Sequence, residues 1–202
     1  MDCSGASAAE QAFPEEDDGL LFRQLNPLCV AINTDCAQLV AVINMPVPVR
    51  YHFTQHFKVP ARQAYNWCTD YDPQDRELMG DKNGKRLITP ICESTVILTD
   101  TFQTEKGMVE KQKLVALYPD RLAWVATHLA GPSKYSQFLY KIFPEGEGAS
   151  RLEFTALYLD YSKEAADEEE IKRLADELRK SDAGTWRLLA EAMEKELSAR
   201  KL

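Results

Sequence analysis

The clearest pattern in the chain is an alternation of apolar and polar residues that begins near Arg50. From Tyr51 to Val59 the odd positions are mostly apolar and the even positions mostly polar, which is the period of two of a half-buried strand. Pro60 ends this segment, and the apolar side chains of residues 61–69 recur at helical spacing. Asp72 and Pro73 then form a good cap and first turn for a second short helix through Met79.

Six more strand-like segments follow, with turn sequences rich in Gly, Pro and Asp between them. They cover residues 85–91, 94–102, 107–118, 121–129, 135–143 and 151–161. Because the connections are short, neighbouring strands are expected to run antiparallel.

The chain is expected to end in a long amphipathic helix. Asp167 can cap it, with Glu170 three places further on. One apolar stripe follows the whole segment: Ile171, Leu174, Leu178, Thr185, Leu189, Met193 and Leu197, widened by Trp186 and Leu188. The predicted fold class is therefore α+β: a curved seven-stranded antiparallel sheet wrapped around a long C-terminal helix, with two short helices after the first strand.

The region before this domain has a different composition. Residues 1–19 are small and acidic and are expected to be at least partly disordered, whereas residues 20–44 are apolar but show no clean period. Met45 could be the natural start of the protein, or residues 1–44 could be a real N-terminal extension. The expected division is an extension over 1–44 and the domain over 49–202.

Charge and cysteine content narrow the possible partners. Residues 1–49 hold seven acidic residues and one basic residue, so the rest of the chain carries −2 of the total charge of −8. Such a domain lacks the positive surface needed for nucleic acid, and no segment is apolar enough for stable membrane insertion. Five cysteines without metal or redox spacing favour the cytoplasm. We expect a monomer or a homodimer.

Three stretches carry a resemblance to a known superfamily. VPARQAYNWCTDYDPQDRELMG resembles the opening of the START-like superfamily, also called SRPBCC, and LYPDRLAWVATHLAG and YKIFPEGEGASRLEF resemble its central hairpins. The order of elements is also similar to that of this superfamily, which includes the polyketide cyclase and dehydrase group and the lipid-transport group. The resemblance implies the helix-grip fold, with a deep cavity between sheet and terminal helix for lipids, sterols, polyketides or other apolar molecules.

Neither a metal nor a nucleotide site is predicted. His52 and His56 lie about 13 Å apart if their segment is a strand, which is too far for one ion. Both fall on polar positions, and we expect them to be exposed. The sequence also lacks a glycine-rich phosphate loop and a Gly-x-Ser-x-Gly motif, so no cofactor is expected.

His128 is the histidine best placed to face a cavity, because Trp124 and Ala126 share its side of the strand. It could orient a ligand carbonyl or act as a catalytic acid or base; alternatively, it is a strand-end histidine without a catalytic task. The predicted pocket residues are Trp124, His128, Phe138, Tyr140, Phe154, Tyr158, Trp186 and Leu189. Core packing alone could also explain these aromatic side chains.

Three functions remain open at this point. The first is binding or carriage of a hydrophobic small molecule. The second is a cyclase or dehydratase enzyme that uses the same cavity, with His128 or a tyrosine for proton transfer. The third is an interaction module of the kind found in chaperone activators of this fold, which would have a closed core and an exposed apolar patch.

Overall fold

The computed structural model of the protein describes residues 45–71, 84–104, 107–162 and 165–199. The elements along the chain are β1 Val47–Phe57, α1 Ala61–Thr69, β2 Lys85–Cys92, β3 Thr95–Thr104, β4 Gly107–Tyr118, a short 3-10 turn η1 Pro119–Arg121, β5 Ala123–Ala130, β6 Gln137–Pro144, β7 Ser150–Asp160 and α3 Glu168–Ala199. The second short helix predicted from Asp72 to Met79, and every prediction for residues 1–44, lie outside the described residues.

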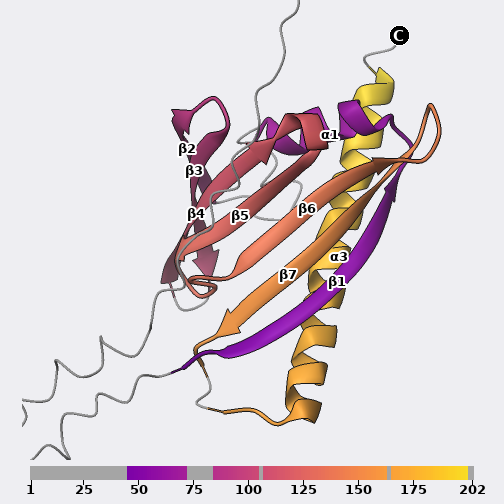
Figure 1. The fold of residues 1–202 in the computed structure, drawn as a ribbon. Helices are drawn as coiled ribbons and strands as arrows, with labels where there is room; N and C mark the ends of the chain where they lie inside the picture. The colour runs from indigo at the N-terminus through magenta and orange to yellow at the C-terminus, as the bar shows by residue number, and fades with distance from the viewer. Residues whose placement is uncertain (1–44, 72–83, 105–106, 163–164, 200–202) are drawn as a thin grey trace, which may run out of the picture. The chain divides into compact units, whose positions relative to one another are not determined.

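The strands form one antiparallel sheet in the order β1-β7-β6-β5-β4-β3-β2 (Figure 1). β2 to β7 follow one another as neighbours, as their short connections predict. β1 is the exception because it pairs with β7 at the opposite edge from β2, with Phe53 opposite Phe154. The seven-stranded sheet and the long final helix confirm the predicted fold class.

β1 begins earlier than the alternation alone predicts, at Val47 instead of Tyr51, and ends at Phe57 instead of Val59. Pro48 is compatible with this extension because β1 is an edge strand, where a missing backbone N–H need not interrupt the sheet. Along β1 the odd positions Tyr51, Phe53 and Phe57 are buried, while His52 and His56 are exposed, as predicted.

α3 begins where the capping pattern predicts. The Glu170 backbone N–H donates to Asp167 Oδ1 at 2.8 Å, and the acidic residues of the first turn suit the positive end of the helix dipole. Near the other end, Trp67 Nε1 of α1 donates to Glu196 Oε2 at 2.9 Å. The apolar stripe faces the sheet, except that Leu188 is 46% exposed.

Two clusters of buried residues hold α3 against the sheet. The first, which we call the β1 core, joins β1 and β7 to the beginning of α3 through Ile171, Leu174 and Leu178. The second, the α1 core, joins α1 and the middle strands to the end of α3 through Leu189 and Met193. Phe138, Tyr140 and Trp186 pack against both clusters. The region between the two cores is therefore bordered by aromatic rings.

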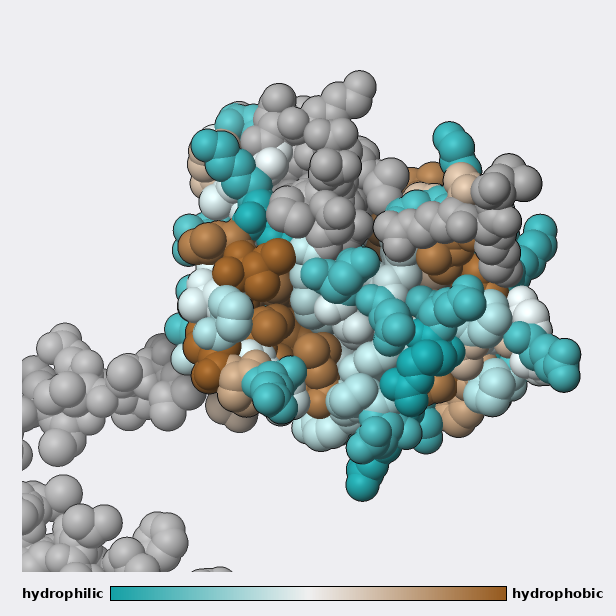
Figure 2. Space-filling model, turned by 90° about the horizontal axis from the view of Figure 1, so that it is seen from above, coloured by the Kyte–Doolittle hydropathy of each residue, from teal (hydrophilic) through white to brown (hydrophobic). Residues whose placement is uncertain are grey.

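The surface is mixed rather than uniformly charged. Figure 2 shows separate apolar patches among hydrophilic side chains on the face that it presents. Large apolar side chains that are exposed include Leu87 and Ile91 on the edge strand β2, Met108 on β4 and Leu139 on β6. No helix among the described residues is long and apolar enough to cross a membrane.

Candidate functional site

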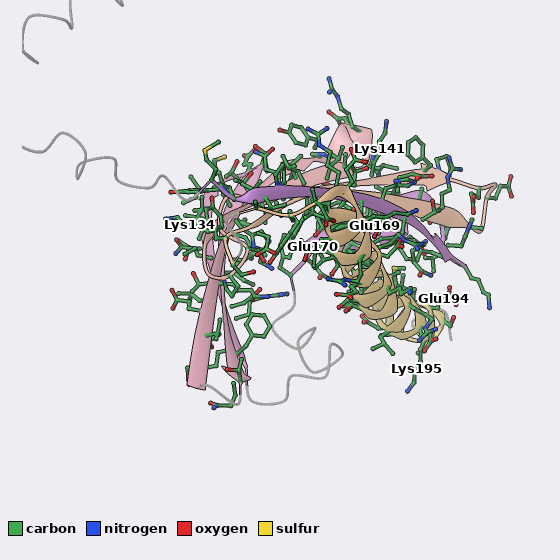
Figure 3. The ribbon with its side chains drawn as sticks, turned by 90° about the horizontal axis from the view of Figure 1, so that it is seen from below. Lys134, Lys141, Glu169, Glu170, Glu194 and Lys195 are labelled. Carbon is green, nitrogen blue, oxygen red and sulfur yellow. The ribbon has the colours of Figure 1, made fainter. Side chains whose placement is uncertain are left out.

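A cavity of about 370 Å³ lies between the inner face of the sheet and α3. Its lining comes from α1, from every strand except β1, and from α3. Three strands contribute every second residue, as the pleat requires: Leu98, Asp100 and Phe102 on β3; Lys111, Lys113 and Val115 on β4; and Trp124, Ala126 and His128 on β5. In Figure 3 α3 crosses one face of the sheet, from Glu169 and Glu170 towards Glu194 and Lys195, while Lys141 projects from the other face.

Aromatic rings form a large part of the wall. The rings of Trp124 and Tyr140 stack with their centroids 4.8 Å apart and their planes inclined by 4°. Tyr140 meets Phe154 edge to face at 5.0 Å, and the indole of Trp186 lies 5.6 Å from the Tyr140 ring. These contacts tie β5, β6, β7 and α3 together and leave rigid apolar surfaces around the cavity.

The structure brings most of the predicted pocket residues together. Those that line the cavity are Trp124, His128, Phe138, Tyr140, Phe154, Trp186 and Leu189. Tyr158 is not among them: it lies opposite Val49 and packs in the β1 core. Strand parity places Tyr158 on the same face as Phe154, but it cannot say how far along the strand the cavity extends.

His128 is a buried, neutral group on this wall. It is 5% exposed, and its ring meets Phe138 edge to face at 4.8 Å. Its Nδ1 atom has no hydrogen-bond partner within the part of the chain that the structure describes. Burial, followed by the charges of Lys113 and Lys111, lowers the pKa of His128 to about 3. Near neutral pH the imidazole can therefore offer a hydrogen bond to a ligand without carrying charge.

A charged cluster lies on the β2–β4 side of the cavity. Asp100, 1% exposed, accepts a 2.7 Å hydrogen bond from Arg86 Nε, and its other oxygen lies 2.9 Å from Lys113 Nζ. Burial alone would raise the pKa of Asp100, but Lys113 and Arg86 together lower it to about 2. Asp100 is therefore a permanent carboxylate held between two cations.

A second carboxyl group approaches the cavity from α3. Asp182 Oδ2 accepts a hydrogen bond of 2.6 Å from Tyr51 Oη. Burial raises the pKa of Asp182, although the Tyr51 hydrogen bond and the charge of Lys111 oppose the shift.

Five charged residues of the cavity were not predicted from the sequence: Arg86, Asp100, Lys111, Lys113 and Asp182. Strand alternation could have identified some of them. Asp100 lies on the same side of β3 as Leu98 and Phe102, and Lys113 lies on the same side of β4 as Val115. Charged residues at inward positions of predicted strands are rare unless they are paired, so they merit attention as site candidates. Among the described residues no group of three His, Cys, Asp or Glu side chains could hold a metal ion.

No protein-family model matches this chain, and no curated protein sequence matches it. Solved structures do. The Zhui aromatase/cyclase from Streptomyces sp. R1128 matches with a TM-score of 0.58 at 12% identity, over 77% of this chain and 97% of its own. Ara h 8.0201 matches with a TM-score of 0.58 at 12% identity, over 73% and 98%.

Norcoclaurine synthase from Thalictrum flavum, solved in complex with dopamine and hydroxybenzaldehyde, matches with a TM-score of 0.55 at 14% identity, over 77% of this chain and 89% of its own. At such low identities these likenesses bear on the fold. Together with the sheet order and the position of α3, they show that the chain shares the helix-grip fold of these proteins.

Proposed function

We propose that the protein binds an apolar small molecule in the cavity between the sheet and α3. The observation that carries this proposal is the cavity itself, with its walls of Trp124, Phe138, Tyr140, Phe154 and Trp186. Ligand sites are typically concave and mostly apolar, with a few polar groups that orient the ligand. His128, Lys113 and Asp182 supply such groups here.

The size of the cavity favours a compact ligand. Its volume is about 370 Å³. This is near the lower end of the roughly 300–1,000 Å³ found for small-molecule pockets. A molecule of a few fused or linked rings fits this space better than a lipid with long acyl chains.

The structural neighbours support the same class of ligand. One is an aromatase/cyclase, and another was solved with dopamine and hydroxybenzaldehyde, which are small aromatic molecules. Because the fold alone is shared, the likeness supports a cavity for apolar or aromatic molecules and does not select one of them.

Native mass spectrometry of the purified protein, followed by organic extraction, tests the proposal directly. We expect a stoichiometric apolar passenger or, if the protein is purified empty, saturable binding of the neutral fluorescent dye N-phenylnaphthylamine. An empty protein that does not bind this dye would contradict the proposal.

A cavity-filling variant shows where the dye binds. Ala126→Phe places a ring inside the cavity, since Ala126 lines it, and should reduce binding by about tenfold or more. Val125→Phe is the matched control, because Val125 is the neighbouring residue on the same strand and does not line the cavity. Equal binding by both variants would place the dye outside the cavity.

Catalysis in the same cavity is the second candidate. Two cavity groups have opposite pKa shifts, a lowered pKa for His128 and a raised pKa for Asp182, as expected where proton donors and acceptors are tuned. A cyclase or dehydratase would use these groups to move protons while the walls hold a carbonyl-containing chain in position. His128→Ala would then abolish turnover while the dye still binds; in a carrier it would change affinity alone.

The interaction-module alternative receives less support. Leu87 and Ile91 do leave apolar side chains exposed on β2. However, that alternative predicts a closed core, whereas a cavity lies between the sheet and α3.

A further inference from the structure

Among the described residues that line the cavity, cationic side chains outnumber carboxylates. Three cations, Arg86, Lys111 and Lys113, line it on the β2–β4 side. The carboxylates among the described lining residues are Asp100 and Asp182. Asp100 lies among the cations, whereas Asp182 approaches from α3.

Neither described carboxylate forms a close ion pair with Lys111, although the charge of Lys111 opposes the rise in the pKa of Asp182. Asp100 is already shared between Arg86 and Lys113, at 2.7 Å and 2.9 Å. Asp182 is held by Tyr51 at 2.6 Å. Within the described ranges no carboxylate oxygen lies at ion-pairing distance from Lys111 Nζ, which instead lies 4.9 Å from the centroid of the Phe102 ring. Lys111 is half-buried, and its ammonium group lies near an aromatic ring. It can therefore still bind an anion.

A second group on the same wall also lacks a partner. Lys113 and His128 lie opposite each other on β4 and β5, and both line the cavity. The Nδ1 atom of His128 is buried without a hydrogen bond to any described residue. Buried polar groups are normally satisfied, so this nitrogen is free to hydrogen-bond a water molecule or a ligand.

From this arrangement we propose that the ligand is a compact ring system with one anionic group, such as a carboxylate, which lies against Lys111 and Lys113 and hydrogen-bonds His128 Nδ1. The rings lie against Phe138, Phe154 and Trp186. The inference rests on the proposed function, since it assigns a chemical class to the ligand of the same cavity.

Two dyes that differ in a single group test this charge preference. Anilinonaphthalene sulfonate carries one sulfonate that N-phenylnaphthylamine lacks, and both fluoresce in apolar surroundings. We expect the sulfonate to bind the wild-type protein about tenfold tighter or more, as a charge-assisted hydrogen bond in a buried site would give. Ala126→Phe should weaken the binding of both dyes, which shows that both occupy the cavity.

Variants of Lys111 locate the preference. Lys111→Met removes the charge but keeps an unbranched side chain, and should bring the affinity of the sulfonate close to that of the neutral dye. Lys111→Arg keeps the charge and should keep most of the preference. Lys141→Met is the control for net charge, because Lys141 projects from the outer face of the sheet (Figure 3), and it should leave the preference unchanged.

The outcomes separate this inference from the proposed function. If the neutral dye binds in the cavity and the sulfonate binds no better, the anionic class is wrong and the cavity remains a binding site. A preference that persists in Lys111→Met but falls in Lys141→Met would also overturn it. If neither dye binds, the proposed function fails and the inference with it. Unchanged binding of the neutral dye by Lys111→Met shows that this variant is folded.

Discussion

Tyr51 and Asp182 are joined by a hydrogen bond of 2.6 Å across 131 positions of the sequence. Tyr51 belongs to the edge strand β1 and Asp182 to α3, beside the cavity. The bond therefore links the sheet to the helix between the β1 core and the cavity. In this bond the Tyr51 hydroxyl group is the donor and the Asp182 carboxylate is the acceptor.

Removing the hydroxyl group of Tyr51 should destabilise the protein. Tyr51→Phe keeps the ring but leaves the half-buried carboxyl group of Asp182 without its donor. We expect the free energy of unfolding in urea to fall by about 1–2 kcal/mol. Tyr158→Phe is the control, because the hydroxyl group of Tyr158 forms no hydrogen bond with the described residues. It should change the free energy of unfolding by less than about 0.5 kcal/mol. Equal losses would show that the Tyr51–Asp182 bond contributes nothing.

Gly131 is predicted to be irreplaceable in the turn between β5 and β6. Its φ is +93°, and a Cβ atom there would lie 2.6 Å from the backbone oxygen of Glu110. Gly131→Ala should therefore lower stability by about 2–5 kcal/mol, from backbone strain and a clash with main chain.

Gly146→Ala is the matched control for this effect. Gly146 has a similar φ of +89°, but its added Cβ would meet no atom within 4 Å. It should cost about 1–2 kcal/mol, the strain of the backbone alone. Urea unfolding followed by circular dichroism measures both variants. A similar loss in the two would mean that the contact with Glu110 is easily relieved.

His128 should make the folded protein less stable in acid. Its pKa is about 3 in the folded protein, against an ordinary 6.5. Between these values the unfolded chain binds a proton here that the folded protein does not, so stability falls as the pH falls. The slope approaches about 1.4 kcal/mol per pH unit. His128→Leu should therefore show a flatter dependence of unfolding free energy on pH between about 6.5 and 3.

Comparing the pH dependence of unfolding free energy in His128→Leu with that in the wild-type protein cancels the contributions of the other titratable groups. Asp182 acts in the opposite sense, because burial raises its pKa and acid then favours the folded state, but it is present in both proteins. A His128→Leu slope equal to that of the wild type would show that His128 is protonated as readily in the folded protein as in the unfolded chain.

Gly184 offers a stabilising change. It lies inside α3, where glycine is unfavourable by roughly 1 kcal/mol relative to alanine. An added Cβ would meet no atom within 4 Å, so no close approach requires glycine there. Gly184→Ala should raise the free energy of unfolding by about 0.5–1 kcal/mol. A loss of stability in thermal or urea unfolding would mean that the helix needs its flexibility at this residue.

The sequence by itself determined the elements and the faces that they bury. α1 covers Ala61–Thr69 and β4 covers Gly107–Tyr118, as the patterns predict, because helical spacing, strand alternation and turn residues are local properties of the chain. The alternation also placed Trp124, Ala126 and His128 on one side of their strand, and the structure shows that this side faces the cavity. For the same reason it identified most of the aromatic residues that line the cavity.

Only the tertiary structure decided which inward residues reach the cavity and how its charges are paired. Parity gives a side of a strand but not a distance from α3, so Phe154 and Tyr158 are equivalent in the sequence, and only Phe154 lines the cavity. Arg86, Asp100 and Lys113 come from three strands, and their contacts depend on the register between them. Pairings between distant segments follow from packing, and no local period along the chain encodes them.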